Sequence, residues 1–264
     1  MKKRFLTFAF ALLGMTALPQ TLEVGLFGGI AYYLGDLNPG IHFLAPKPAY
    51  GLLARYNLDT RWVIKANAYM GMIKGDDHMG RTNDIRGLKF ESKITDISIT
   101  GEFNFFDYFT GSRRNLITPY IFGGVGVVFF KPTADGVDLR SIGTEGQQIG
   151  FDGRKPYNLV AFSIPFGIGV KYSINRRLCL SAEWGLRKSF TDYLDDVSTT
   201  YYLEGATIDP GNTDEVLSDP TMVHKPRQER GNPSTNDWYN FTGISLTYKF
   251  RLVGKNKCPD QKKT

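Results

Sequence analysis

Three histidines are the side chains that could support hydrolytic chemistry in this 264-residue chain: His42, His78 and His224. A histidine held by a carboxylate can activate a serine nucleophile, and His78 directly follows Asp76 and Asp77. A loop serine such as Ser198 would complete the set. No spacing typical of such a site connects these residues, and long polar loops bring such groups together by chance. The sequence therefore predicts no catalytic residue.

Acidic and sulfur-containing side chains are the candidates for metal binding. Asp192, Asp195 and Asp196 could bind Ca²⁺, but they lack the ordered ligand spacing of a calcium loop. Solvated charge is the preferred interpretation of this cluster. The two cysteines of the chain give no metal framework. The sequence therefore predicts neither a metal nor another cofactor.

A signal-peptide pattern occupies residues 1–20. A basic segment (2–4) precedes an apolar stretch (5–13) and a zone of small residues (14–17), and cleavage is expected within 17–20. The alternative is a short anchor helix, but the stretch is shorter than the roughly 20 residues that a membrane span needs. Without the three basic residues of this segment the formal net charge falls from +6 to +3. Nothing in the sequence predicts binding to nucleic acid.

Strict alternation of apolar and polar residues marks the segment 96–106. One face carries Ile97, Ile99, Phe103 and Phe105, and the other carries Asp96, Ser98, Thr100, Glu102 and Asn104. The first face suits lipid or a core, and the second suits water. A soluble sandwich can show the same period. Because the alternation recurs along the whole chain behind an export signal, the sequence favours the bacterial outer membrane.

Eight segments show strand patterns, at 22–33, 48–57, 62–73, 90–106, 118–130, 158–174, 178–190 and 239–250. Short connections (58–61, 107–117, 175–177) alternate with long ones (34–47, 74–89, 131–157, 191–238). The sequence therefore predicts an all-β fold, an OmpA/OmpW-like, eight-stranded antiparallel up-and-down transmembrane β-barrel over residues 21–252, followed by a basic tail at 253–264. Short turns of such barrels face the periplasm, so both termini are expected there.

The polar face of these strands carries eight charged residues of both signs: Arg55, Lys65, Asp96, Glu102, Lys171, Glu183, Arg187 and Lys249. An eight-stranded barrel leaves room only for side chains or one small ligand. Charges buried in so narrow a lumen are tolerable only as hydrogen-bonded ion pairs. We therefore expect a lumen filled by an ion-pair network rather than a diffusion channel.

Two positions depart from the regular strand pattern. The apolar alternation shifts between Ile94 and Ile97, which predicts a β-bulge near Thr95. Pro165 lies inside a predicted strand, where its missing N–H should produce a bulge or a local break in the hydrogen-bond ladder.

The two cysteines, Cys179 and Cys258, are expected near one another. Cys179 begins the seventh predicted strand and Cys258 follows the eighth, and antiparallel neighbours would bring them close. In an oxidising periplasm they could form a disulfide that holds the tail against the barrel. The alternative is that Cys179 is an inert lumen residue.

Charge differs between the two ends of the predicted barrel. The short turns and the tail are basic, and they offer six possible contacts to a periplasmic partner: Arg113, Arg114, Arg176, Arg177, Lys255 and Lys257. These cations could meet anionic lipid head groups or an acidic periplasmic protein. The long loop 191–238 is acidic, and it is either a binding surface or a solvated cover.

Four segments carry a resemblance to a known family: GGIAYYLGDLN at 28–38, PYIFGGVGVVFFKP at 119–132, IPFGIGVKYSI at 164–174 and LSAEWGLRKSFTDYLDDVSTTYY at 180–202. Together they resemble the PorG-like family, which are small outer-membrane barrels of the type IX secretion system in Bacteroidetes. The resemblance implies a non-enzymatic component needed for export of cargo proteins. Its implied partners are outer-membrane lipid and a periplasmic ring made of a lipoprotein and its partner subunit. The alternative is a free-standing OmpA/OmpW-like envelope barrel that stabilises the membrane or binds a small ligand.

Overall fold

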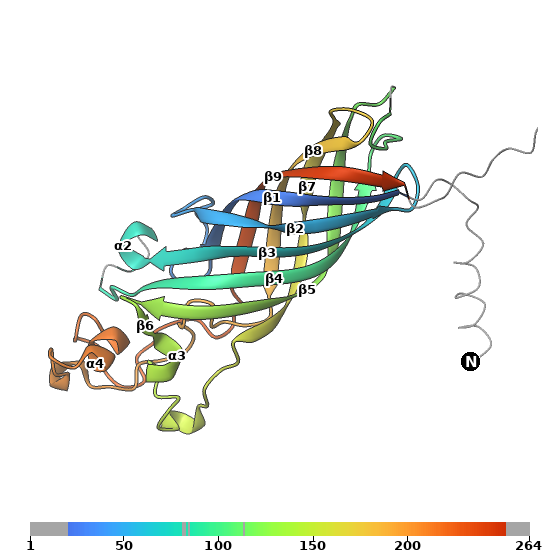
Figure 1. The fold of residues 1–264 in the computed structure, drawn as a ribbon. Coiled ribbons are helices and arrows are strands. Elements are labelled where there is room, and N and C mark those ends of the chain that lie inside the picture. The colour runs from blue at the N-terminus through green and yellow to red at the C-terminus, as the bar shows by residue number, and fades with distance from the viewer. Residues whose placement is uncertain (1–20, 81–82, 84, 113, 252–264) are drawn as a thin grey trace, which may run out of the picture.

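Eight long antiparallel strands close into a barrel in the computed structural model, which describes residues 21–80, 83, 85–112 and 114–251 (Figure 1). The strands are β1 (Thr21–Leu34), β2 (Lys47–Asn57), β3 (Trp62–Asp76), β4 (Lys89–Asn104), β5 (Ile117–Ala134), β7 (Val160–Ser173), β8 (Leu178–Ser189) and β9 (Trp238–Arg251). Their order is β4-β3-β2-β1-β9-β8-β7-β5, and pairing of β4 with β5 closes the ring. The predicted fold class is confirmed. The predicted signal peptide and basic tail lie outside the described residues.

Short elements occupy the longer connections: α2 (Asp77–Gly80), β6 (Val137–Asp138), α3 (Leu139–Ile142), α4 (Thr213–Ser218) and two 3₁₀ turns, η2 (Phe151–Gly153) and η3 (Gly205–Thr207). Figure 1 shows α2, α3 and α4 at one end of the barrel, which we call the loop end. The first residue of β1 pairs with the last residue of β9 at the opposite end, which we call the turn end. Among the described residues, no helix is long and apolar enough to cross a membrane.

The alternation of side chains explains why these segments form barrel strands. Successive residues of a strand point to opposite faces, and along β4 every second residue is buried. Outward positions carry exposed apolar side chains, such as Leu26, Val125 and Phe162. Close approach of neighbouring strands also requires glycine at Gly124, where a Cβ atom would lie 2.1 Å from the carbonyl oxygen of Ile99.

The predicted strands agree with the observed ones, with two extensions. β3 continues to Asp76 and β5 to Ala134, beyond the predicted ends at 73 and 130. Both extensions pair in regular register with neighbouring strands at the loop end. Their outward side chains are polar and their inward residues include Gly75 and Pro132, because the strands leave the apolar belt there, so the alternation that marks the belt no longer identifies them.

The predicted β-bulge near Thr95 is wrong. Thr95 pairs with Met70 on β3 and with Phe129 on β5 in unbroken register. Ile94 points into the barrel, where it is 2 % exposed. The shift in apolar alternation therefore reflects an interior that becomes apolar toward the loop end, not an extra residue in the strand.

The break predicted at Pro165 is confirmed. β5 and β7 pair from Ile117 to Gly123 and again from Gly126 to Phe129, in the same register on both sides of the gap. Pro165 remains paired with Arg187 on β8. The missing N–H thus interrupts one ladder locally and introduces no bulge.

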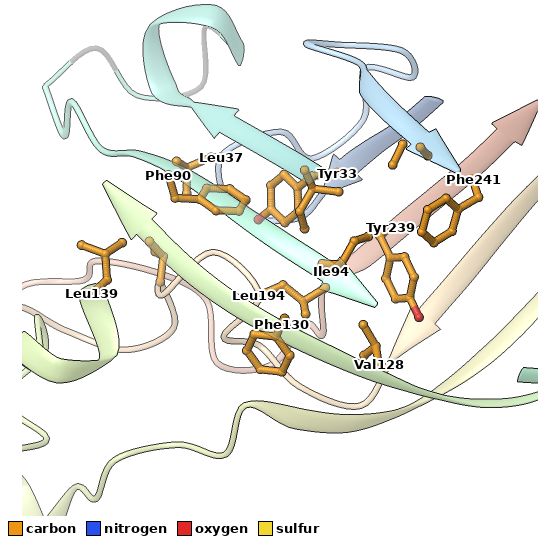
Figure 2. Packing of buried hydrophobic residues seen from close by; sticks show 14 of the residues in the cluster. Tyr33, Leu37, Phe90, Ile94, Val128, Phe130, Leu139, Leu194, Tyr239 and Phe241 are labelled. Carbon is orange, nitrogen blue, oxygen red and sulfur yellow. The ribbon is translucent and has the colours of Figure 1, made fainter. Parts of the chain in front are cut away.

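The apolar core lies in the loop-end half of the barrel. Figure 2 shows Phe90, Ile94 and Phe130 from the barrel wall close to Leu194, which comes from the connection between β8 and β9. Leu194 is completely buried. This connection therefore folds into the mouth of the barrel.

Candidate functional site

The outward face of the barrel is apolar and the inward face is polar. Leu26, Val125 and Phe162 are each 65 to 72 % exposed on the outside, while Arg55 and Glu102 are fully buried inside. A protein dissolved in water would not expose so continuous an apolar belt. Strands that bond to one another in a closed ring also leave no open sheet edge exposed to lipid. The chain is therefore an outer-membrane type of β-barrel.

Charged side chains fill the turn-end half of the lumen. Glu102 lies 3.2 Å from Arg55 and 3.4 Å from Lys65. Lys171 contacts the second oxygen of the same carboxylate at 2.5 Å. Lys65 also contacts Glu183 at 2.8 Å. These five predicted lumen residues therefore form one connected network in which each charge faces an opposite one.

Two further predicted lumen residues lie apart from this network. Asp96 accepts hydrogen bonds from the hydroxyls of Tyr239, at 2.7 Å, and Ser98, at 2.8 Å. Arg187 stacks its guanidinium over the ring of Phe241, 4.8 Å from the centroid, and donates to the carbonyl of Gly185. Both groups are buried, and their partners are neutral hydrogen-bonding or aromatic groups.

The turn end of the lumen contains a buried carboxylate that sequence reasoning missed. Glu23 is 2 % exposed and accepts hydrogen bonds from Thr110, at 2.5 Å, and Thr247, at 2.9 Å. Glu23 lies at an inward position in the alternating pattern of β1, and this position could have identified it as a lumen residue. Lys249 is only half-buried near this end, with its ammonium 5.7 Å from the centre of the Phe109 ring.

The loop end is closed by a folded cover, which we call the lid: the described residues of segments 35–46, 77–88, 135–159 and 190–237. The preferred interpretation of Asp192, Asp195 and Asp196 as solvated charge is wrong. Asp195 and Asp196 are 1 % and 0 % exposed, and Asp192 is also buried. The three carboxylates face polar groups of the lid and of strand ends rather than water.

Asp195 and Asp237 converge on one hydroxyl group. Tyr33 at the end of β1 donates to Asp195, and its hydroxyl oxygen also lies 3.1 Å from Asp237. Burial and the negative charges of Asp36 and Asp192 raise the pKa of both carboxyls well above the usual range, and the charge of Asp195 raises that of Asp237 further. For Asp192, burial together with Asp36 and Glu145 raises the pKa to about 8.

A second carboxylate pair organises the centre of the lid. Glu145 accepts hydrogen bonds from the backbone N–H groups of Ser198, at 2.9 Å, and Thr199, at 3.0 Å. Arg230 contacts Glu145 at 3.2 Å and lies 3.9 Å from Asp196. Burial nevertheless raises the pKa of Asp196 to about 7, although the charge of Arg230 acts in the opposite direction.

Arg86 connects separate segments of the lid. Its guanidinium contacts both oxygens of Asp77, at 2.8 and 2.5 Å. It also donates to the backbone carbonyl of Arg230, at 2.7 Å, and to that of Asp36, at 2.9 Å. One side chain thus joins the connections that follow β1, β3 and β8.

The rings of two candidate catalytic histidines, His42 and His224, contact groups other than Ser198, while His78 is exposed and its backbone N–H donates to Asp76 at 2.9 Å. The ring of His42 hydrogen-bonds the Tyr32 hydroxyl at 3.0 Å. His224 contacts Asp219 at 2.8 Å and stacks on Tyr201. In the part of the chain that the structure describes, no group of three histidine, cysteine or acidic side chains is placed to hold a metal ion.

The basic turn end brings two hairpins together. The N–H of Gly111 donates to Ser173 at 2.8 Å, which joins the β4–β5 turn to the end of β7 in the β7–β8 hairpin. Arg114, Arg176 and Arg177 are exposed there. Arg113, Lys255 and Lys257, the other predicted contacts, lie outside the described residues.

The side chain of Cys179 is buried in the lumen. The hydroxyl of Tyr108 donates to its sulfur at 3.2 Å. Cys258 lies outside the described residues, so the predicted disulfide stays a prediction.

Comparison with known proteins gives three kinds of finding. Similar solved structures include the Yersinia pestis attachment invasion locus protein Ail in complex with sucrose octasulfate (9 % identity, TM-score 0.43, 88 % of this chain and 100 % of that one). They also include Neisserial surface protein A (10 % identity, TM-score 0.46, 87 % of this chain and 97 % of that one). A third is the N-terminal β-barrel domain of Pseudomonas aeruginosa OprF (10 % identity, TM-score 0.41, 89 % of this chain and 100 % of that one). No curated protein matches the chain. A family model described as a domain of unknown function, DUF6089, matches residues 2–259, and the chain therefore belongs to the DUF6089 family.

Proposed function

We propose that this chain is a non-enzymatic outer-membrane component of the type IX protein secretion machinery. In this role the barrel stands in the outer membrane with its turn end in the periplasm and binds a ring that contains a lipoprotein. The observation that carries the proposal is a cluster of exposed arginines at the turn end of a barrel whose interior is filled. The resemblance of four segments to PorG-like barrels supports the same role.

A filled interior favours action through surfaces rather than through transport. The side chains of Arg55, Lys65 and Glu102 are no more than 1 % exposed, so water does not reach them from either end. A cargo protein would need a far wider passage than eight strands provide. The barrel would therefore serve the machinery as an anchor or a docking platform.

The turn end offers the surface that such docking needs. Arg114, Arg176 and Arg177 come from two hairpins that are hydrogen-bonded to each other, and Arg177 donates to the hydroxyl of Tyr248 at 2.8 Å. Arg61 is already paired with Asp107 at 2.8 Å and contributes less. Exposed cations of this kind favour an acidic protein partner and accelerate its association.

The test reverses the charge of this surface. The variant Arg114→Glu/Arg176→Glu/Arg177→Glu should insert normally but recover much less of the ring lipoprotein in a pulldown from solubilised outer membranes. Secretion of cargo should fall in parallel. The control, Lys155→Glu/Lys225→Glu, reverses two exposed cations of the lid and should leave ring recovery intact. Unchanged ring recovery with the arginine variant would refute the docking proposal.

A second candidate is a free-standing envelope barrel that binds a small ligand. It is favoured by a cavity of about 400 Å³ at the loop end, lined in part by Leu37, Leu88 and Leu217. Deletion of the gene separates the two functions. Normal secretion together with increased detergent sensitivity would favour the free-standing barrel, and loss of secreted cargo would favour the secretion component.

A further inference from the structure

Lysines gather on the outward face of the barrel at the loop end of β3, β4 and β5. Lys93 and Lys131 are exposed and lie directly opposite each other on β4 and β5. On β3, Met72 pairs with Lys93. Lys74 lies two residues further toward the lid, on the same outward face. We call Lys74, Lys93 and Lys131 the lysine patch.

The direct opposition of two lysines requires an explanation. Like charges that face each other across paired strands destabilise the sheet, because their Cβ atoms lie only about 5 Å apart. Lys131 has a partial partner in Asp138, at 3.2 Å. Lys93 has no ion pair in the part of the chain that the structure describes. The protein itself therefore does not fully neutralise the pair.

A neighbouring carboxylate is already shared between two other lysines. Glu91 lies 3.6 Å from Lys74 and 3.4 Å from Lys47. Lys89 pairs with Asp135 at 2.8 Å, further toward the lid. Glu91 and Asp135 thus offset part of the charge of Lys47, Lys74 and Lys89, and Lys93 and Lys131 add further positive charge on the side closest to the apolar belt.

The lysine patch lies at the boundary of that belt. Met70, Ile97 and Phe129 are the exposed apolar residues nearest to it on the same three strands. On β5 the belt runs from Ile117 to Phe129, which corresponds to about 40 Å along the strand and about 28 Å across a membrane at a 45° tilt. This height matches the hydrocarbon thickness of a bilayer, so the patch lies at the level of lipid head groups.

A recess adjoins the patch. A cavity of about 230 Å³ is lined by Lys74, Lys89, Glu91 and Thr133, among others. The hydroxyl of Thr133 donates to the backbone carbonyl of Glu91, at 2.9 Å. Of the lysine patch, Lys74 lines this recess, which lies on the lid side of Lys93 and Lys131, whereas the apolar residues of the belt lie on their other side.

We propose that the lysine patch binds the phosphate group of an anionic membrane lipid. Lys93 and Lys131 hold the phosphate between their ammonium groups, and Lys74 supplies a third cation from the adjacent strand. The like-charge pair then becomes a shared site for a dianion, which removes its repulsion. An amphiphile is the occupant that the surroundings favour, because cations adjoin an apolar surface. The proposal depends on membrane insertion and is independent of a role in secretion.

The test compares lipid binding by the intact barrel and by the variant Lys93→Gln/Lys131→Gln. The protein is placed in phosphatidylcholine nanodiscs that contain either lipid A or dephosphorylated lipid A, and the bound glycolipid is counted by native mass spectrometry. The wild type should retain phosphorylated lipid A preferentially. In the variant, the ratio of retained phosphorylated to dephosphorylated lipid A should be about tenfold lower. The control Lys155→Gln/Lys225→Gln, on exposed lysines of the lid, should behave as the wild type.

Several outcomes would overturn the proposal. Equal retention by the wild type and the Lys93/Lys131 variant would do so, as would equal retention of phosphorylated and dephosphorylated lipid. Complete displacement of lipid A by millimolar inorganic phosphate would indicate a site for the free ion instead. A second measurement uses unfolding: in phosphatidylcholine alone the variant should be at least as stable as the wild type, because the repulsion is gone. Addition of lipid A should stabilise only proteins that keep both lysines.

Discussion

At the scale of single residues, buried carboxylates have different partners in the lumen and in the lid. In the lumen, Glu102 has three cations within ion-pair distance. In the lid, Asp195 and Asp237 share the hydroxyl of Tyr33, which carries one hydrogen atom and can donate to only one of them. Burial raises the pKa of both carboxyl groups well above the usual range, so the closed lid favours their protonated forms more than the unfolded chain does.

The balance in the lumen predicts a large effect for Glu102→Gln. The substitution keeps the shape of the side chain but leaves three buried cations facing a neutral amide. We expect the free energy of unfolding to fall by about 3–5 kcal/mol, which is the usual cost of removing one partner of a buried ion pair. The free energy of unfolding is measured by titration with urea, in which folded and unfolded barrels are distinguished by their different electrophoretic mobility. The control Glu91→Gln, whose carboxylate is 42 % exposed, should cost less than about 1 kcal/mol. Equal effects of the two substitutions would contradict the network.

The excess of carboxylates in the lid predicts that lid closure weakens as the pH rises. Asp192 and Asp196 have pKa values of about 8 and about 7 in the folded protein, against 3.8 for an ordinary aspartate. The folded lid thus binds more protons than the unfolded chain between about pH 4 and pH 8, so its stability declines across that window. Cleavage of 190–237 by a protease with a broad pH range should become faster from pH 6 to pH 9.

The control for this pH dependence replaces the titrating groups. In Asp192→Asn/Asp196→Asn the cleavage rate should vary less with pH than in the wild type, because these two amides cannot ionise, although Asp195 and Asp237 still carry raised pKa values. A wild-type rate that falls or stays constant from pH 6 to pH 9 would show that the lid is not held by these protons.

At the scale of elements, the strands follow from local sequence because their two faces meet such different environments. Lipid outside and polar groups inside impose a period of two that each strand carries by itself, as Ile97 and Ile99 alternate with Asp96 and Ser98. The period fails where the environment changes. Ile94 points inward among apolar residues at the mouth of the barrel. The alternation of apolar and polar residues, taken alone, therefore predicts a bulge there that does not exist.

The lid could not be predicted in the same way. Its contacts join residues far apart in sequence, such as Tyr33 with Asp195 and Arg86 with Arg230. No local period marks residues that serve such contacts. A run of aspartates in a long loop has the same appearance whether it is dissolved in water or buried beneath other loops.

Arg86 provides an element-scale prediction because it joins three connections of the lid. In Arg86→Ala the carboxylate of Asp77 loses its bidentate partner, and the carbonyl groups of Arg230 and Asp36 lose a donor. We expect cleavage within 190–237 to accelerate at least tenfold while the barrel keeps its resistance to unfolding in urea. The control Arg227→Ala removes an exposed contact with Asp152 and should change cleavage by less than about twofold. Simultaneous loss of barrel resistance in the Arg86 variant would show that lid and barrel unfold together.

At the scale of the whole molecule, the barrel separates three environments. The turn end carries exposed arginines, the belt carries apolar side chains, and the loop end carries a folded lid above a rim of lysines. The interior is closed at two levels, by the ion pairs around Glu102 and by the lid residues around Leu194 (Figure 2). The surfaces therefore remain as the places where the protein can act.

Closure at two levels predicts how the reconstituted protein conducts ions. In a planar bilayer the intact barrel should show no stepwise conductance, and cleavage of the lid within 190–237 should leave it closed. The reason is that Arg55, Lys65 and Glu102 lie below the lid and are held by strands that the protease does not reach. Stepwise conductance that appears only after cleavage would make the lid the sole plug and would favour a gated channel. Silence before and after cleavage would leave a platform as the function that the molecule can perform, since eight strands filled by their own side chains provide no path for cargo.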